Sequence, residues 1–236
     1  GGKWNCASCH CDISLMDPQS GINFGEIQKF SLSKHNWYLG NCPGNIPRGE
    51  INLHSNTESM TKETIHINCD LGEGGEFDEK LMPHISACNI ACGGHAGNLE
   101  TMHRTVRLAL ENNVEIGAHP SYPDRANFGR NHVEMTAEEL KLSIEGQVLS
   151  LKQIVESEGG KLSHVKLHGA LYNDAAKDRN ISETVVRSLE DLGDDFRLFV
   201  PVNSQLGELA LGRFELYYEA FADRNYEKNY GLVPRS

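Results

Sequence analysis

The segment Ile65–Asp70 reads Ile-His-Ile-Asn-Cys-Asp, so apolar and polar side chains alternate along it. Successive residues of a strand point to opposite faces, which places His66, Asn68 and Asp70 on one face and the isoleucines on the other. Four later segments have a similar character and carry a histidine or a carboxylate near their ends. They are Asn89–His95, Val114–His119, Val165–His168 and Phe214–Asp223. We therefore predict five strands that share one ionisable face.

Segments of helical character separate most of these strands, which predicts parallel strands joined by crossover helices. Asn98 is placed to cap one of these helices, and Thr136 with Glu139 forms a capping-box pattern before another. Parallel strands are normally apolar on both faces, because both faces are covered. The alternative is an antiparallel sheet with one solvated face, which would show the same alternation. Antiparallel strands can be joined by short hairpins, however, so they would not need the helix-length connections of this sequence. We expect an α/β fold whose polar strand ends converge on a functional site.

The bulk properties exclude several classes of function. The net charge of -11 and the pI near 5.4 argue against electrostatic binding to nucleic acid or to an anionic membrane. No apolar run is long enough for a membrane span, and the start lacks the apolar core of a signal peptide. We expect a cytoplasmic protein, with Cys69, Cys88 and Cys92 as buried thiols.

The chain divides near Met60. Residues 1–59 show no sustained period and are expected to be a poorly ordered extension outside the functional domain, whereas residues 60–236 show the regular strand and helix patterns and are expected to form that domain. The extension contains ligand types for zinc but lacks a second tight pair to complete a site. These ligand types are Cys6, Cys9, His10, Cys11 and Cys42.

A glycine-rich turn follows the first strand, reading Asp-Leu-Gly-Glu-Gly-Gly from Asp70. It lacks the Lys-Ser/Thr of a Walker loop, and no other stretch supplies one, so no ATP-binding motif is predicted in this chain. Asp70 and Glu73 are candidates for general base and acid, or for orienting a histidine. The alternative for Glu73 is a solvated turn residue.

Histidines stand at the ends of three of the strand segments. Paired glycines precede His95, which removes side chains that would crowd it, and a proline-framed loop fixes the backbone of His119. Lys166 shares a strand face with His168, a poor choice for a buried structural face but a good one for holding an anion or a developing oxyanion.

The last strand segment ends in Asp223 and Arg224. The carboxylate is suited to orienting a histidine, and the guanidinium to holding a substrate carboxylate. One aspartate with several histidines is also a plausible ligand set for a divalent metal. We expect a metal-free acid–base site; a metal, if present, would be bound by Asp70, His95, His119 and His168.

Taken together and in order, these motifs resemble the LamB/YcsF family from about Ile65 to the end of the chain. The matching segments are Asn68–Gly74, Asn89–Gly93, His95–Gly97, Gly117–Asp124, Val165–Lys166, His168–Tyr172, Phe221–Arg224 and Leu232–Ser236.

The resemblance implies a distorted β/α barrel of the glycoside hydrolase/deacetylase type. It also implies a role in the ATP-dependent opening of 5-oxoproline to glutamate together with subunits B and C, the complex rather than this chain using ATP. Family members have no counterpart of residues 1–59. They continue beyond the position of Ser236 through a further helix and strand, so the barrel is expected to be shortened at its C-terminus.

We expect a hydrolase acting on a cyclic amide bond. Asp70 with His119 or His168 would activate water, and Lys166 would hold the anionic oxygen. The substrate-binding residues are expected to be Glu73, Asn89, His95, Asp223 and Arg224. Two alternatives stay open, a metal-dependent amide deacetylase on the same barrel and a non-catalytic regulatory subunit.

Overall fold

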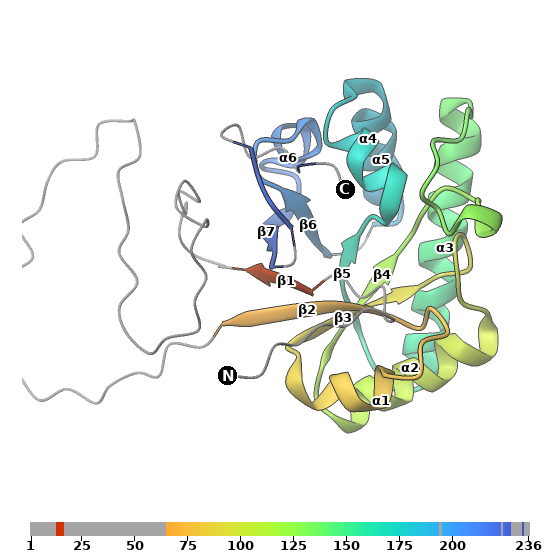
Figure 1. Ribbon diagram of the computed structural model, residues 1–236. Coiled ribbons are helices and arrows are strands. Elements are labelled where there is room, and N and C mark those ends of the chain that lie inside the picture. Colours follow the sequence, from red (N-terminus) through yellow and green to blue (C-terminus); the bar gives the residue numbers. More distant parts are fainter. Residues whose placement is uncertain (1–12, 17–64, 194, 223, 228–232, 234–236) are drawn as a thin grey trace, which may run out of the picture.

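The computed structural model describes residues 13–16, 65–193, 195–222, 224–227 and 233. Strands and helices alternate along most of this chain, with the helices outside the strands (Figure 1). The strands are β1 Ile13–Met16, β2 His66–Leu71, β3 Ala87–Ala91, β4 Glu115–His119, β5 Leu162–Lys166, β6 Arg197–Pro201 and β7 Glu215–Phe221. The α-helices are α1 Asp78–Leu81, α2 Leu99–Glu111, α3 Ala137–Ser157, α4 Gly169–Ala175, α5 Arg179–Asp191 and α6 Gln205–Ala210.

The strands form a closed barrel in the order of the sequence. Strands β2 to β7 run parallel to one another, and β1 lies antiparallel to both β2 and β7. The predicted β/α barrel is confirmed, and the alternative of an antiparallel sheet is wrong. The barrel is distorted because it has seven strands, one of them antiparallel, where a regular β/α barrel has eight parallel ones.

The barrel explains why parallel strands carry polar side chains on one face. Their outward-facing residues, such as Leu71, Ile90 and Val165, belong to the apolar core that the helices cover. The inward-facing residues, such as Asn68 and Lys166, line the interior of the barrel, where they are also buried. One face therefore meets helices and the other meets the opposite wall of the barrel, so the two faces carry different residues.

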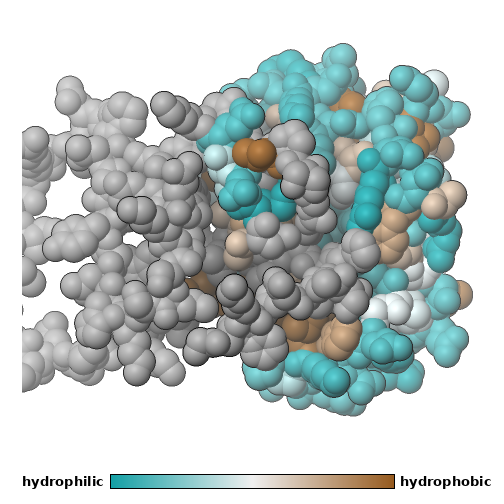
Figure 2. Space-filling view, viewed as in Figure 1, coloured by the Kyte–Doolittle hydropathy of each residue, from teal (hydrophilic) through white to brown (hydrophobic). Residues whose placement is uncertain are grey.

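The predicted helix starts at Asn98 and Thr136 are confirmed. The Asn98 side chain accepts the backbone N–H of Thr101 at 2.9 Å, which caps α2. The Thr136 side chain accepts the backbone N–H of Glu139, and Glu139 accepts the N–H of Thr136 in return, which caps α3. Figure 2 shows that the outer surface over the helices is mainly hydrophilic, as the amphipathic patterns require.

Two features of the strands differ from expectation. Strand β6 was not predicted, because its apolar run is short and has no alternation. Strand β3 ends at Ala91, so His95 lies in a loop rather than on the strand. The loop leaves the strand at Gly93, whose φ of +95° is unfavourable for other residues and allows the chain to turn.

The prediction of buried cysteines is confirmed, since Cys69, Cys88 and Cys92 are all buried, and Cys88 and Cys92 are free thiols. Within the segment 1–59, only β1 belongs to the described residues, so the zinc-ligand types of this segment and Met60 lie outside them, as does Asp223. None of the helices in the described part of the chain is long and apolar enough to cross a membrane.

Candidate functional site

The candidate site lies at the carboxyl ends of the parallel strands, the edge at which β/α barrels place their functional groups. Its side chains come from β2 to β5 and from the loops that follow them. The structure brings together seven of the predicted residues, Asp70, Glu73, Asn89, His95, His119, Lys166 and His168. The Arg224 guanidinium donates to the backbone carbonyl of Val233 at 2.9 Å, and its predicted role stays a prediction.

Asp70 is the centre of the polar network and is only 4 % exposed. Its Oδ1 accepts from the Asn89 amide at 2.7 Å and from the Lys166 ammonium at 3.0 Å. Its Oδ2 lies 3.2 Å from Nε2 of His119. Oδ1 therefore belongs to a network of structural hydrogen bonds, whereas Oδ2 faces a histidine.

Lys166 is buried across the barrel from Asp70. Its Nζ also lies 3.3 Å from Oδ1 of Asn68 and 3.6 Å from a carboxylate oxygen of Glu219 on β7. The ammonium group sits 5.2 Å from the centre of the Phe221 ring, at a distance suited to a cation–π contact. A buried charge is tolerated only when it is paired and hydrogen-bonded, and these contacts meet that need.

The electrostatics of this network favour an ionised Asp70. Burial by itself would raise the pKa of the Asp70 carboxyl, but His119 and Lys166 outweigh burial and hold that pKa well below its ordinary value. Asp70 is thus a carboxylate at neutral pH although it is removed from water. A carboxylate that stays ionised in a fixed position is suited to orienting His119 and to supporting the acid–base chemistry of that ring.

His119 and His168 meet at the mouth of the barrel, each held by a backbone carbonyl. His119 Nδ1 donates to the carbonyl of Lys166 at 2.8 Å, and His168 Nε2 donates to the carbonyl of Phe128 at 3.0 Å. A carbonyl oxygen only accepts, so each of these nitrogens carries the ring proton. The other two nitrogens, Nε2 of His119 and Nδ1 of His168, face each other at 2.9 Å.

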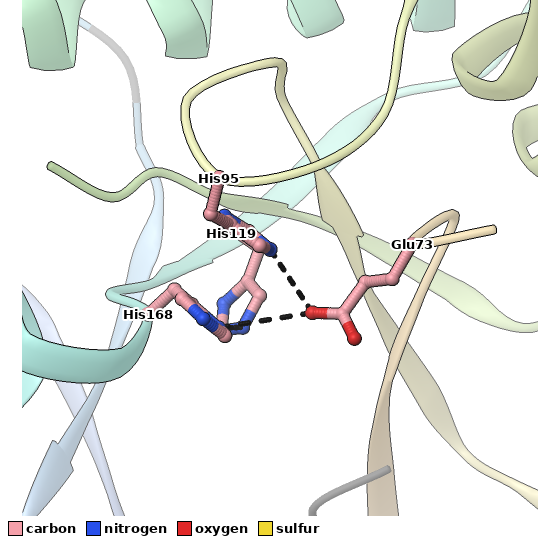
Figure 3. Close-up of side chains that lie close together, drawn as sticks. All are labelled: Glu73, His95, His119 and His168. Carbon is pink, nitrogen blue, oxygen red and sulfur yellow. Dashed lines mark hydrogen bonds and ion pairs between the residues drawn. The ribbon is translucent and has the colours of Figure 1, made fainter. Parts of the chain in front are cut away.

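Glu73 and His95 complete this cluster. Oε1 of Glu73 lies 3.0 Å from Nε2 of His95 and 3.7 Å from Nδ1 of His168 (Figure 3). The His95 ring stacks on the His168 ring with the centroids 3.6 Å apart. Burial lowers the pKa of His95, and it lowers the pKa of His168 to about 3. The solvated-turn alternative for Glu73 is therefore wrong, since its carboxylate turns into the site.

The loop after β4 brings backbone against two of these histidines. Gly129 has a φ of +64°, and a Cβ atom there would lie 2.8 Å from Cβ of His95 and 3.0 Å from Cδ2 of His168. A side chain at this position would displace both rings. The preceding residue, Phe128, supplies the carbonyl that fixes the His168 ring.

Sequence reasoning missed His164 and Glu219 as parts of the site. His164 Nε2 bonds to Oδ1 of Asn89 at 2.8 Å, and its ring stacks on Phe199. Glu219 Oε2 accepts from the Asn68 amide at 3.3 Å. The signal for His164 was present, because it stands two residues before Lys166 and so shares its strand face.

Four ligand atoms in this site are close enough to bind one metal ion. They belong to Glu73, His95, His119 and His168, and all lie within 4.8 Å of one another. The predicted alternative set contained the three histidines with Asp70. The cluster contains Glu73 with the three histidines, and Oδ2 of Asp70 lies beside it, 3.2 Å from Nε2 of His119.

A sequence model of the LamB/YcsF family matches residues 65–236, the stretch that contains β2 to β7 and every residue of this cluster. The chain belongs to the LamB/YcsF family. This LamB/YcsF protein is 46 % identical over 184 residues to the A subunit of 5-oxoprolinase from Vibrio cholerae, an alignment that covers 75 % of each chain.

Two further comparisons agree with this assignment. The A subunit of 5-oxoprolinase from Haemophilus influenzae is 42 % identical over 173 residues, covering 73 % of this LamB/YcsF protein and 71 % of the relative. The crystal structure of a lactam utilization protein from Thermus thermophilus matches with a TM-score of 0.69 and 33 % identity. It covers 71 % of this chain and 70 % of its own, and supports the barrel fold.

Proposed function

We propose that this protein is the subunit of a 5-oxoprolinase that opens the lactam ring of 5-oxoproline to give glutamate. Its similarity to proteins named as the A subunit of 5-oxoprolinase supports the substrate. The observation that carries the chemistry is the buried Asp70 carboxylate, which Lys166 and His119 keep ionised at the mouth of the barrel. The cytoplasmic location expected from the composition stays a prediction.

The reaction explains why such a site needs partners. The lactam is an unstrained amide, so its hydrolysis requires both an activated water and stabilisation of the oxygen that becomes negative. Phosphorylation of the lactam oxygen by ATP would activate the ring carbon toward water. Breaking of the ring C–N bond would then leave an acyl phosphate, whose hydrolysis gives glutamate and phosphate. This chain has no Walker motif, so we assign phosphorylation to the partner subunits B and C and completion of the ring opening to this chain.

The geometry suggests a role for each group. Asp70 and His119 act together to activate the water, with Oδ2 of Asp70 3.2 Å from Nε2 of His119. Lys166 keeps Asp70 charged and places a positive charge where the lactam oxygen becomes anionic. Arg224, at the carboxyl end of β7, is proposed to bind the substrate carboxylate.

A metal-dependent amide deacetylase is the second candidate. One observation favours it, the convergence of three histidines and a glutamate on one point at the barrel mouth. This function needs neither ATP nor partner subunits, which separates it experimentally from the first. Release of acetate or glutamate in the absence of ATP would favour it.

The deciding experiment mixes the purified chain with candidate subunits B and C, ATP and 5-oxoproline, and measures glutamate by chromatography. We expect glutamate only when all three proteins and ATP are present, and its loss when Asp70→Asn replaces the wild-type chain. A folded, assembled complex that makes no glutamate would contradict the proposal. If Asp70→Asn turned over at an undiminished rate, this chain would still be assigned to the 5-oxoprolinase complex, but the chemistry would no longer be placed on this chain.

A further inference from the structure

The cluster at the barrel mouth has an arrangement of protons that neutral side chains alone do not explain. The carbonyls of Lys166 and Phe128 fix the ring protons of His119 and His168 on their outer nitrogens. With both rings neutral, two lone pairs face each other at 2.9 Å. Two lone pairs repel each other at this separation unless a proton or a cation lies between or beside them.

The carboxylates around the histidines also favour a cation. Among the described residues, the carboxylate of Asp70 lies beside His119, and that of Glu73 lies beside His95 and His168. A divalent cation among the histidines would be attracted by both carboxylates.

The distances fit a metal ion of the zinc type. Four donors placed tetrahedrally about 2.1 Å from an ion lie about 3.4 Å from one another. The pairs in the cluster are separated by 2.9 Å for His119 with His168, 3.0 Å for His95 with Glu73, and 3.7 Å for His168 with Glu73. All four atoms lie within 4.8 Å of one another, and the His95 ring, which stacks on His168, has to turn so that its nitrogen points at the ion.

Two of the three histidines have the second hydrogen bond that metal-binding histidines make, whereas Nδ1 of His95 has no partner among the described residues. A histidine that binds a metal donates its other ring N–H to a carbonyl or a carboxylate, which fixes the tautomer and the ring orientation. His119 and His168 both have this second bond, to backbone carbonyls that no side-chain change can remove. The ligand nitrogens are therefore presented with their lone pairs inward before any ion arrives.

We propose that Glu73, His95, His119 and His168 bind one divalent transition-metal ion, with the ligand preference of zinc or cobalt. Three nitrogens and one carboxylate oxygen suit these ions better than magnesium or calcium. Such an ion supplies Lewis acidity, lowering the pKa of a bound water or polarising an amide carbonyl. Asp70 lies beside the cluster, with Oδ2 3.2 Å from the His119 nitrogen, in position to accept a proton there.

The first test measures metal binding by the purified full chain, without partners or substrate. The protein is stripped with chelator, equilibrated with Co²⁺ or Zn²⁺ and dialysed, and bound metal is counted by mass spectrometry. We expect one ion per chain that depends on the cluster, and for Co²⁺ the intense visible absorption of a four-coordinate site. We also expect the ion to raise the melting temperature.

Variants locate the ion. Glu73→Gln and His168→Gln are each expected to weaken binding at least about 100-fold and to abolish the metal-dependent rise in melting temperature. Glu134→Gln and His103→Gln remove the same residue types from exposed or half-exposed positions outside the cluster and are expected to bind like the wild type. Far-ultraviolet circular dichroism confirms that each variant is folded.

Three results would overturn the proposal. The first is that the wild type retains no ion, which would mean that a proton shared among the histidines balances the cluster. The second is that both cluster variants bind as tightly as the wild type. The third is a cobalt–thiolate charge-transfer band, which would place the ion on cysteines. Because binding is measured on the isolated chain and glutamate formation on the complex, failure here is distinguishable from failure of the proposed function, whose site this inference deepens.

Discussion

At the scale of single residues, Asp70 concentrates the functional chemistry of the barrel. Its carboxylate lies 3.0 Å from the Lys166 ammonium and that of Glu219 lies 3.6 Å from it, and of these two carboxylates it is Asp70 that faces His119. Asparagine has nearly the same shape but neither the charge nor the basicity. Replacement therefore tests the chemistry of the carboxylate with little change in packing.

We predict that Asp70→Asn lowers the turnover of the assembled complex by about 10²–10⁴-fold, the range for loss of a general base. Glutamate formation under saturating ATP and 5-oxoproline is the measurement. Asp195→Asn, which removes an exposed carboxylate, is the control and should turn over normally. Equal losses in the two variants would point to a general effect of charge rather than to Asp70.

A second residue-scale prediction concerns Gly117 in β4. A Cβ atom there would lie 2.0 Å from Nε2 of His164, which fills the space beside it inside the barrel. Gly117→Ala is expected to displace His164 from Asn89 and to destabilise the protein by about 1–3 kcal/mol. For a domain of this size, the melting temperature falls by roughly 2–4 °C per kcal/mol.

Gly146→Ala is the matched control for that prediction. Gly146 lies in the exposed part of α3, and a Cβ atom there would meet nothing within 4 Å. Alanine is the better helix former by about 1 kcal/mol, so this variant should melt at the same or a higher temperature. A melting temperature for Gly117→Ala that equals that of Gly146→Ala would contradict the proposed packing of His164.

At the scale of elements, the capping box of α3 stabilises the start of one helix and does not involve the candidate site. Thr136 satisfies the N–H of Glu139, and Glu139 satisfies that of Thr136, at the start of a helix of 21 residues. This helix packs its buried side over the barrel through residues such as Ile144 and Leu151. Its first turn is therefore coupled to the whole core.

We predict that Thr136→Ala lowers the free energy of unfolding by about 1 kcal/mol, the usual cost of removing a cap. Chemical denaturation followed by circular dichroism is the measurement. Gln153→Ala, an exposed exchange between two good helix formers in the same helix, should change the stability little. A loss confined to Gln153→Ala would show that capping is not what stabilises this helix.

At the scale of the whole molecule, a second polar cluster joins strands across the amino-terminal end of the barrel. Glu115 on β4 lies 2.7 Å from Arg197 on β6 and 3.8 Å from His66 on β2. The Arg197 guanidinium also lies 4.9 Å from the centre of the Tyr217 ring on β7. Four strands thus meet in one cluster, and its charge state bears on the stability of the barrel as a unit.

We predict a pH-dependent contribution of Glu115 to stability. His66 and Arg197 lower the pKa of the Glu115 carboxyl to about 2, so the folded state binds its proton less readily than the unfolded state does. The contribution is therefore complete above the ordinary pKa of the carboxyl. It is lost as the pH falls toward 2.

The test compares Glu115→Gln with the wild type by denaturation at pH 7 and at pH 3. Because the Glu115 side chain is 40 % exposed, we expect the variant to be less stable by only about 1 kcal/mol at pH 7 and by less than half of that at pH 3. Glu111→Gln, at an exposed position, should show no such change with pH. A difference that grows at low pH would reverse the assigned sign.

Much of the fold was predictable because local patterns in the sequence indicate it. The alternation along Ile65–Asp70 reports the two faces of β2, and the capping residues Asn98 and Thr136 mark where α2 and α3 begin. Strand β6 was not predicted because it is a short apolar run without alternation. Periodicity alone cannot distinguish such a run from a helical segment. The strand ends also indicated most of the site, since parallel strands place those ends at one edge.

The sequence patterns by themselves thus determined the parallel strands joined by helices, the starts of α2 and α3 and the residue types at the strand ends, whereas the resemblance to the LamB/YcsF family implied the barrel. Only the tertiary structure decided how those residues pair. It brought Glu73, rather than Asp70, to His95 and His168, and it placed His164 against Gly117. It also fixed the proton positions on His119 and His168 through backbone carbonyls 47 and 40 residues away. Periodicity reports which face a side chain occupies, whereas these choices depend on distances across the barrel that no local pattern contains.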